Sequence, residues 1–380
     1  MPPSPLDRRT FLLRVVQLSG LAIGGGTLLE ACSSKKTTVA ATGAPASSTV
    51  GTSTSSAAGS PSAAMSSAAK ADYGQLDFRL SWVKNVEFAG EYFADSKGYY
   101  KAEGFSSVNI QGGGPTATPV ETDLVQKKTF CGISAPDITG AAVVQGAPLK
   151  IVGAQYQKNP FAILSLAKNP IKTPQDMIGK KIGVQATNES IWTAFLKANN
   201  LDPSKITKVP VQFDPTPLTT GTVDGWFSFI TNEPITIAGK GFPVVTFLLA
   251  DFNYPLVSEC YVVRTDDIKN NRAKIKAMLR AEIKGWKDNI ADPAAGAALA
   301  VNTYGKDLGN TVAEQTLESK AENELIVSAD TTKNGLLTVT PELLAANMKT
   351  LAVAGIKLTQ DQLFDMSLID EIYKEDPSLI

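Results

Sequence analysis

Short apolar runs alternate with amphipathic stretches along most of the chain beyond residue 75. Runs in which apolar residues cluster or alternate predict strands, and stretches in which they recur every three or four positions predict helices. The predicted strands are 78–82, 108–110, 130–134, 149–155, 161–167, 181–185, 206–213, 223–230, 244–249 and 257–264. The predicted helices are 88–102, 119–127, 136–145, 190–199, 232–239, 268–290 and 293–304, with more helix toward the C-terminus. This order predicts an α/β fold with mostly parallel sheets covered by helices.

The pattern falls into two similar α/β units, because a turn signal at Lys168-Asn169-Pro170 separates two alternating series. We predict that residues 75–165 and 262–380 form lobe I, and that residues 166–261, inserted between them, form lobe II. Two extended segments, near 163–167 and 261–265, would then join the two doubly wound lobes as hinges. Ligands of open α/β sheets sit beyond the carboxyl ends of the strands, so we expect a site between the lobes.

The first 74 residues follow a different pattern. Arg8-Arg9 resembles a twin-arginine export signal and precedes a weakly apolar stretch at 11–29. The run Leu28-Leu29-Glu30-Ala31-Cys32 resembles a bacterial lipobox, so we predict an export signal at 1–31, cleavage before Cys32 and acylation of its sulfur. Residues 32–74 are rich in Ser, Thr, Ala and Gly and predict a flexible tether. We expect a lipid-anchored protein on the extracytoplasmic face of the cell membrane.

Composition narrows the chemistry. The chain contains no histidine, which removes the commonest general base and the commonest metal ligand. Apart from Cys32, only Cys131 and Cys260 remain, which disfavours thiol catalysis and zinc sites. An exported protein permits either a disulfide between them or two free thiols. The formal net charge is −1 without a basic run, so we expect no nucleic-acid partner. The absence of histidine and the small number of cysteines lead us to expect no metal. We also expect no cofactor.

Several motifs resemble the substrate-binding proteins of ABC importers. They are Leu80-Ser81-Trp82-Val83-Lys84-Asn85, Gly98-Tyr99-Tyr100-Lys101-Ala102-Glu103-Gly104-Phe105, Phe213-Asp214-Pro215, Gly221-Thr222-Val223-Asp224-Gly225 and Asn232-Glu233-Pro234. The group they resemble is NMT1/THI5-like and includes binders of thiamine pyrimidine precursors, riboflavin and sulfonates. The resemblance implies a type II periplasmic-binding-protein-like fold, a small-molecule ligand, and an ABC permease with its ATPase as partners. We expect the protein itself to be a monomer.

One fungal branch of this family is an enzyme that makes the pyrimidine, and it uses an active-site histidine and a cysteine-rich motif. This chain has neither feature. We therefore expect a binding protein and not an enzyme. Two alternatives of other classes remain: an exported enzyme with a carboxylate or lysine centre, and a sensory or adhesive lipoprotein without a transport partner.

Aromatic side chains near predicted strand ends and helix starts are candidates for stacking on a flat ligand. Trp82 ends the first predicted strand, and Trp192 lies near the start of the first helix of lobe II. Trp226 lies in or beside a strand, where a core position is equally expected. Tyr156 and Tyr254 flank the two predicted crossings.

Polar candidates follow predicted strands, at positions where they could also cap a helix. They are Asn85, Glu87, Ser134, Asp137, Asn188, Asn232 and Glu233. Together with the aromatic candidates they favour a small flat heterocycle, such as a thiamine pyrimidine precursor or riboflavin. A sulfonate or nitrate-type anion is the alternative, and it would require fixed N–H donors or an arginine. Arg79 and Arg264 are the arginines nearest the predicted cleft, and both lie in strand-like runs.

Overall fold

The computed structural model describes residues 71–380, which form one compact unit. The predicted export signal, Cys32 and most of the predicted tether lie outside the described residues. Between residues 71 and 380, no helix combines the length and apolar character that a bilayer span requires. The amide of Tyr73 donates to the carbonyl of Gly104 at 2.9 Å, so backbone pairing begins two residues before the predicted start of lobe I.

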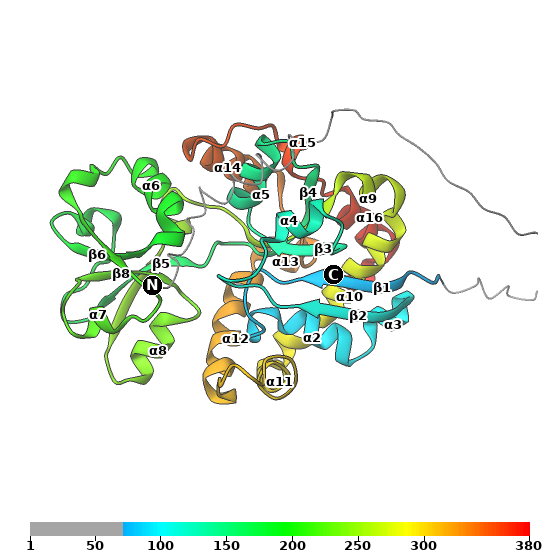
Figure 1. Cartoon of the computed structure of the whole chain (residues 1–380), viewed down its shortest axis with the longest axis horizontal. Helices are drawn as coiled ribbons and strands as arrows, with labels where there is room; N and C mark the ends of the chain where they lie inside the picture. Colours follow the sequence, from blue (N-terminus) through cyan, green and yellow to red (C-terminus); the bar gives the residue numbers. More distant parts are fainter. Residues whose placement is uncertain (1–70) are drawn as a thin grey trace, which may run out of the picture. The chain divides into compact units, whose positions relative to one another are not determined.

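The first sheet has the strand order β2-β1-β3-β10-β4 (Figure 1). Its strands are β1 (Gly74–Arg79), β2 (Phe105–Gln111), β3 (Cys131–Ser134), β4 (Leu149–Tyr156) and β10 (Ser258–Arg264). β1 runs parallel to β2 and β3, whereas β10 runs antiparallel to β3 and β4.

The prediction that Trp82 ends the first strand was wrong. The last bond to β2 comes from the Leu80 amide, and Trp82 lies in the loop beyond it, where its carbonyl accepts from the Gly113 amide.

The second sheet has the order β7-β6-β8-β5-β9. Its strands are β5 (Phe161–Leu166), β6 (Lys181–Gln185), β7 (Thr207–Val211), β8 (Gly225–Phe229) and β9 (Val244–Leu248). β6 runs parallel to β7 and β8, whereas β5 runs antiparallel to β8 and β9. The alternation of short apolar runs therefore predicted the strands of both sheets closely.

In each sheet, the antiparallel strand is the one that follows a crossing between the lobes. β4 ends at Tyr156 and β5 begins at Phe161, while β9 ends at Leu248 and β10 begins at Ser258. The parallel strands of both sheets point their carboxyl ends toward the crossings, so each entering strand runs the other way. All of β5 pairs in lobe II and all of β10 in lobe I. The crossings are thus residues 157–160 and 249–257, a few residues before the predicted boundaries.

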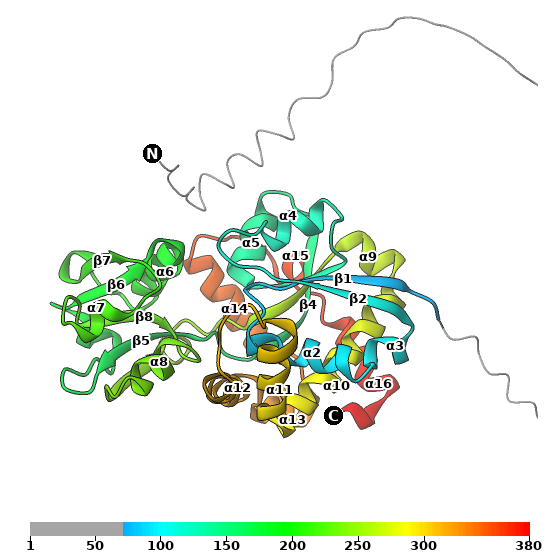
Figure 2. The same cartoon turned by 60° about the horizontal axis from the view of Figure 1, so that its bottom comes forward.

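Helices lie on both sides of the sheets, and in lobe I α4 and α5 lie on one face with α2 and α10 on the other (Figures 1 and 2). The helices are α2 (Ala89–Ser96), α3 (Tyr99–Glu103), α4 (Val120–Val125), α5 (Pro136–Val144), α6 (Glu189–Ala198), α7 (Thr216–Thr219), α8 (Glu233–Gly239), α9 (Thr265–Asn270), α10 (Arg272–Ala291), α11 (Pro293–Leu299), α12 (Val312–Ile326), α13 (Ala329–Asn334), α14 (Pro341–Val353), α15 (Gln360–Leu363) and α16 (Ser367–Glu375). Shorter turns are η1 (Val86–Phe88), η2 (Pro174–Met177), η3 (Ala186–Asn188), η4 (Pro203–Lys205), η5 (Leu249–Asp251), η6 (Ala300–Tyr304) and η7 (Pro377–Leu379). The predicted helix 88–102 is interrupted at Gly98, whose φ of 72° ends α2 and begins α3.

Alternate residues of β10 face opposite sides of the first sheet, as strand geometry requires. Tyr261 belongs to the hydrophobic cluster that α2 and α10 contribute to, whereas Cys260 belongs to a second cluster. Cys131 of the neighbouring β3 belongs to the first cluster. The two cysteines therefore lie on opposite faces of the sheet. Both are buried and free, which excludes the disulfide that the sequence left open.

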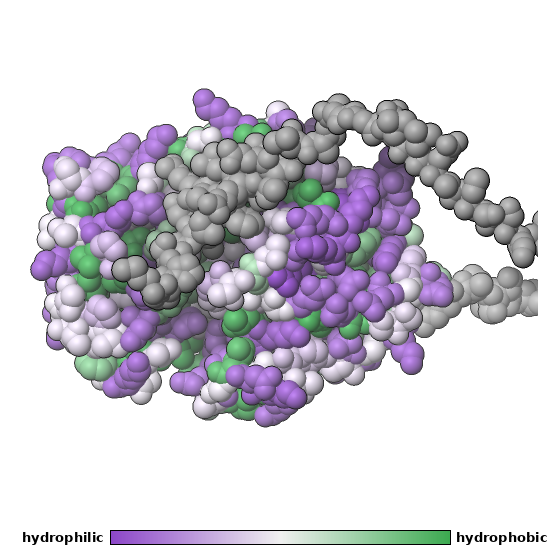
Figure 3. Space-filling model, in the orientation of Figure 1, coloured by the Kyte–Doolittle hydropathy of each residue, from purple (hydrophilic) through white to green (hydrophobic). Residues whose placement is uncertain are grey.

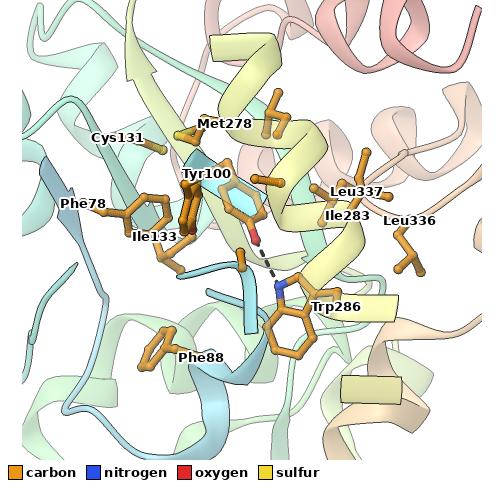
Figure 4. Packing of buried hydrophobic residues seen from close by; sticks show 14 of the residues in the cluster. Phe78, Phe88, Tyr100, Cys131, Ile133, Met278, Ile283, Trp286, Leu336 and Leu337 are labelled. Atoms are coloured by element: carbon orange, nitrogen blue, oxygen red, sulfur yellow. Dashed lines mark hydrogen bonds between the residues drawn. The ribbon is translucent and has the colours of Figure 1, made fainter. Parts of the chain in front are cut away.

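Helices α2 and α10 pack closely because two glycines face each other at their contact. A Cβ atom on Gly285 would lie 2.0 Å from the carbonyl oxygen of Gly90. Trp286 packs over Gly90 and donates its indole N–H to the Tyr261 hydroxyl at 3.0 Å, the hydrogen bond drawn in Figure 4. This packing anchors α10 beneath the first sheet and fixes the side of β10 on which Tyr261 and Glu259 lie.

Candidate functional site

Four buried glutamates converge at the edge of the first sheet where the crossings begin. We call Glu87, Glu259, Glu318 and Glu322 the glutamate cluster. Glu87 lies in η1, Glu259 is the second residue of β10, and Glu318 and Glu322 lie one turn apart on α12. Their exposure ranges from 0% to 7%, so all four carboxyls are removed from bulk water. Such burial is rare for glutamate unless the side chain has a partner.

Hydrogen bonds connect the cluster to the loop that follows β1. Ser81 Oγ donates to Glu259 Oε2 at 2.6 Å, and Asn85 Nδ2 donates to Glu318 Oε1 at 3.2 Å. The side-chain amide of Gln315, one turn before Glu318 on α12, also donates to Glu318. The loop after β1 therefore holds carboxyls from two elements that are distant in sequence.

Burial raises the pKa of every member of the cluster. It is the largest cause for Glu87, whose pKa lies well above its usual range and is raised further by the charges of Glu259, Glu322 and Glu318. Burial raises the pKa of Glu259 to about 7 and that of Glu318 to about 8. The pKa of Glu322 is also well above its usual range, from burial and then from its neighbours. A hydrogen bond joins the carboxyls of Glu87 and Glu259, so the cluster retains protons at neutral pH.

No lysine or arginine between residues 71 and 380 forms an ion pair with the cluster. The described arginines are all engaged by carboxylates elsewhere. The pairs are Arg79 with Asp123, Arg264 with Asp267, Arg272 with Glu371 and Arg280 with Glu103. The cluster is thus a buried acidic group without a positive partner from the described chain.

Several buried polar atoms beside the cluster lack a hydrogen-bond partner. They are both carboxyl oxygens of Glu322, the Tyr156 hydroxyl, Gln155 Oε1 and Asn85 Oδ1. Tyr156 and Gln155 are 0% exposed, and all four cluster glutamates act on the Tyr156 hydroxyl, whose pKa burial and these charges raise. Each buried polar atom without a partner costs about 1–3 kcal/mol. The arrangement offers acceptors that a ligand's donors could satisfy.

Lobe II approaches this region through α8 and the loop after β7. Glu233, the half-buried first residue of α8, accepts from the Phe229 amide at 2.8 Å, and its charge acts on Glu318. Burial raises the pKa of Glu233 to about 7. The half-buried ring of Trp82 lies 5.9 Å from the ring of Phe213, at an interplanar angle of 57°. Since Trp82 belongs to lobe I and Phe213 to lobe II, the cluster lies where the lobes meet.

Some predicted site residues lie together. Asn85, Glu87 and Tyr156 belong to the region of the cluster, with Glu233 beside it. Trp82 adjoins Ser81, whose hydroxyl reaches Glu259. These residues come from the loop and short helix after β1, from the end of β4 and from the start of α8. Asn85, Glu87 and Glu233 follow strands, and Tyr156 is the last residue of β4, so all four lie near the carboxyl end of a strand.

The predicted tryptophan sandwich does not form. Trp82 packs at the margin of the first hydrophobic cluster, Trp192 is 4% exposed in the second, and Trp226 is fully buried in a third, on the other face of the second sheet. The ring of Trp192 meets Phe227 edge to face at 6.3 Å. Trp192 is core because it lies on the face of α6 that packs against the sheet. Tyr254 is likewise buried, edge to face with Phe195.

The remaining polar candidates make other contacts. Ser134 donates to Glu121 at 2.5 Å, and Asn188 donates to Gln185 at 3.0 Å. Asp137 is half-buried at the start of α5, and its charge acts on Tyr254. Asn232 is exposed at the N-terminus of α8 and makes no side-chain capping bond.

Sequence reasoning missed Glu259, Glu318 and Glu322. A signal for two of them exists, because Gln315, Glu318 and Glu322 are spaced three and four residues apart and share one face of α12. That polar face is the buried one, while Leu317 on the same helix is 54% exposed. Ordinary amphipathic reasoning assigns the opposite orientation.

Two hollows of the described part are lined by residues outside the glutamate cluster. One of about 500 Å³ lies between α8 and α12, beside Ile235 and Leu317, and one of about 440 Å³ lies over α6, beside Trp192. On the face drawn in Figure 3, hydrophobic residues are scattered among hydrophilic ones. Residues 71–380 contain no group of three or more Cys, Asp or Glu side chains arranged to hold a metal ion.

Comparisons with known proteins agree with this architecture. The riboflavin-binding protein RibY of Chloroflexus aurantiacus is 28% identical over 230 residues, which cover 58% of this chain and 63% of RibY. The 4-amino-5-hydroxymethyl-2-methylpyrimidine phosphate synthase of Schizosaccharomyces pombe is 24% identical over 233 residues, which cover 58% of this chain and 66% of the synthase. The chain therefore spans less than two thirds of the length of either relative.

Among solved structures, the periplasmic aliphatic sulphonate binding protein SsuA from Escherichia coli matches with a TM-score of 0.55 at 18% identity, over 73% of this chain and 86% of SsuA. This likeness confirms the predicted α/β fold of the type II periplasmic-binding-protein class. The family described as NMT1/THI5 like matches residues 85–296, more than half of the chain. The resemblance predicted from the sequence motifs is thereby confirmed, and this chain belongs to the NMT1/THI5-like family.

Proposed function

We propose that this protein is the extracytoplasmic solute-binding component of an ABC importer, and that it captures a small flat heterocycle between its lobes. The glutamate cluster carries the proposal. It lies where two α/β lobes meet, and unpartnered buried acceptors surround it. The likeness to the riboflavin-binding protein RibY supports a heterocyclic ligand.

The proposal includes the location of the protein. Acylation of Cys32 would tether the folded unit to the cell membrane through the predicted tether, residues 32–74, after export by the twin-arginine route. The lobes would close over the solute and present it to a transmembrane permease with its ATPase. Ligand binding would stabilise the closed arrangement relative to the open one.

The arginines of the described chain argue against an anionic solute. A sulfonate or nitrate is best held by a free guanidinium or by fixed N–H donors. All four described arginines are already paired with carboxylates, and the buried side chains at the lobe junction are acids. We therefore favour a heterocycle that presents hydrogen-bond donors over the anion alternative.

A thermal-shift panel tests the proposal. The purified full chain is heated with riboflavin, with 4-amino-5-hydroxymethyl-2-methylpyrimidine, with methanesulfonate or with nitrate, each over a concentration series. A binding protein gains Tm with ligand concentration, by an amount that follows the ratio of concentration to Kd. We expect a heterocycle to raise Tm and the anions to leave it unchanged. A shift with methanesulfonate or nitrate alone would contradict the heterocycle.

One observation favours a second candidate, an exported enzyme. The hydrogen-bonded carboxyls of Glu87 and Glu259 have raised pKa values, the feature of many acid–base pairs. Prolonged incubation of each heterocycle with the protein, followed by mass spectrometry, separates the candidates. Intact compound supports capture, and a new product that disappears in the Glu259→Gln variant supports catalysis.

A further inference from the structure

Building on the proposed function, we infer that the solute presents a cationic, amidine-like or amino-heterocyclic edge, whose N–H groups donate to the glutamate cluster and displace protons from it. This deepens the proposal, because family membership alone admits neutral, anionic and cationic solutes. The inference uses side chains that the folded chain leaves without partners.

The first observation is the missing counter-charge. Glu87, Glu259, Glu318 and Glu322 come from three different elements and still meet in one buried region without a lysine or arginine partner from residues 71–380. A buried charge is retained in proteins when it is paired, and otherwise the group binds a proton. Protons can neutralise these carboxyls, but residues 71–380 place no positively charged side chain beside them. A cationic solute would therefore provide the missing counter-charge.

The second observation is independent of the carboxyls. The Tyr156 hydroxyl and Gln155 Oε1 are fully buried, lack hydrogen-bond partners, and lie on the strand that ends at the first crossing. All four cluster glutamates act on the Tyr156 hydroxyl, which therefore faces the same region. Gln155 is held there, because its side-chain amide donates to the carbonyl of Glu87 at 3.1 Å. A solute with several N–H donors would satisfy these acceptors together with the carboxyls.

Geometry also suggests how the edge would be held. A planar amidine presents two parallel N–H donors, and such forks pair with carboxylates in bidentate fashion. Glu322 offers two free oxygens for this contact. Trp82 and Phe213, the aromatic pair that bridges the lobes, lie beside the same loop and could cover the ring of a flat solute.

Binding would be coupled to pH, because every titratable group near the cluster is an acid, which is either neutral or negatively charged. The titratable groups that act on the cluster from its packed elements are Glu91, Glu233, Glu314, Tyr92 and Tyr156, and none of them supplies a positive charge. In the free protein the carboxyls hold protons. When a cation enters, carboxyls ionise against it, and each proton that leaves a carboxyl goes to solvent. Affinity for a permanent cation therefore rises as pH increases from 6 to 8.

Three probes of one shape test the charge preference. Benzamidine, benzamide and benzoate share a ring and a planar substituent, and they carry positive, zero and negative charge. Their affinities for the full chain are measured by calorimetry at pH 6 and pH 8. We expect benzamidine to bind roughly tenfold or more tightly than benzoate at pH 8, and its affinity to rise by up to about tenfold per pH unit for each carboxyl that ionises.

A matched pair of variants on α12 tests whether the preference for benzamidine depends on a buried carboxyl of the glutamate cluster. Glu322→Gln removes a buried carboxyl, whereas Glu324→Gln changes an exposed glutamate on the same helix. We expect Glu322→Gln to leave the Tm of the free protein unchanged or higher, because it removes a group that is costly to bury, and to weaken benzamidine binding about tenfold. Glu324→Gln should change neither quantity. A merely structural glutamate would instead lower the Tm and leave the benzamidine affinity of the folded fraction unaltered.

The outcomes separate this inference from the proposed function. Tighter binding of benzamidine that depends on Glu322 and on pH supports it. Equal or tighter binding of benzoate overturns the cationic preference, as does benzamidine binding that ignores Glu322. A riboflavin arm in the same experiment reports on the proposed function. If riboflavin binds and benzamidine does not, the cationic inference fails while the solute-binding function stands. If neither benzamidine nor either heterocycle of the thermal-shift panel binds, both fail.

Discussion

Lobe I contains two groups of buried carboxyls that differ in their partners. In the core, Tyr261 lies 3.2 Å from both Glu91 and Glu282, and Tyr100 donates to Glu282 as well. A hydroxyl has one hydrogen, so one of these carboxyls must itself carry a proton, in agreement with the pKa of Glu282, which burial raises to about 8. In this core group one carboxyl oxygen, Glu91 Oε2, lacks a partner, whereas in the glutamate cluster both oxygens of Glu322 are unpartnered. Both groups are buried, and the larger share of unpartnered oxygens on Glu322 is the difference on which the proposed binding site rests.

The largest expected effect is on the pH dependence of stability. The raised pKa values mean that the folded chain retains protons that the unfolded chain has lost above about pH 4.5. The free energy of unfolding therefore falls as pH rises from 5 to 8, a range that spans the values to which burial raises the pKa of Glu259 and of Glu318. Each carboxyl contributes up to about 1.4 kcal/mol per pH unit over the range in which the folded chain keeps its proton and the unfolded chain has lost it.

Urea unfolding of the ligand-free full chain at pH 5, 6, 7 and 8 measures this dependence. Glu322→Gln should flatten it, because that variant has one fewer proton to lose. Stability that stays constant, or increases over this range, would mean that the carboxyls are already ionised and compensated.

The next largest effect separates the two groups with one pair of matched substitutions. Tyr261→Phe removes a hydroxyl that accepts from Trp286 and pairs with Glu91 and Glu282, so we expect a loss of about 1–3 kcal/mol in the free energy of unfolding. Tyr156→Phe removes a buried hydroxyl without a partner, so the free energy of unfolding should stay unchanged or rise by up to about 1–3 kcal/mol. Denaturant unfolding compares them directly. Similar losses in both variants would erase the distinction between the groups.

A smaller effect is expected at the contact between the lobes. Trp82→Ala or Phe213→Ala removes one ring of the bridging pair, and either should weaken benzamidine binding by about threefold to tenfold. Intrinsic fluorescence of Trp82 provides a second reading, because closure would change its surroundings. Affinity that both variants leave unchanged would remove these rings from the site.

The smallest effect is expected at Trp192. This residue lies in the core on α6, so Trp192→Phe should alter the benzamidine Kd by less than about twofold while lowering Tm. The variant is the matched control for Trp82. Comparable losses of affinity in Trp192→Phe and Trp82→Ala would restore the predicted tryptophan sandwich.

Sequence periodicity predicted the two sheets because the apolar pattern of each strand is local in sequence, as it is in β6 at Lys181–Gln185. It also selected Asn85 and Glu87, which lie in the region of the glutamate cluster, because side chains beyond strand ends gather at one edge. It failed where orientation depends on distant contacts. Trp192 and Trp226 fill opposite faces of one sheet, and the polar face of α12 turns inward only because Glu318 and Glu322 meet Glu259, which lies far away in sequence.

The central claim is that the glutamate cluster gives up protons when it binds a cationic solute. The most direct test is the number of protons released when benzamidine binds the full chain at pH 7. Titration calorimetry in two buffers of different ionisation enthalpy gives this number. We predict net release, in an amount that falls in Glu322→Gln and stays unchanged in Glu324→Gln. Zero release or net uptake on binding would contradict the account.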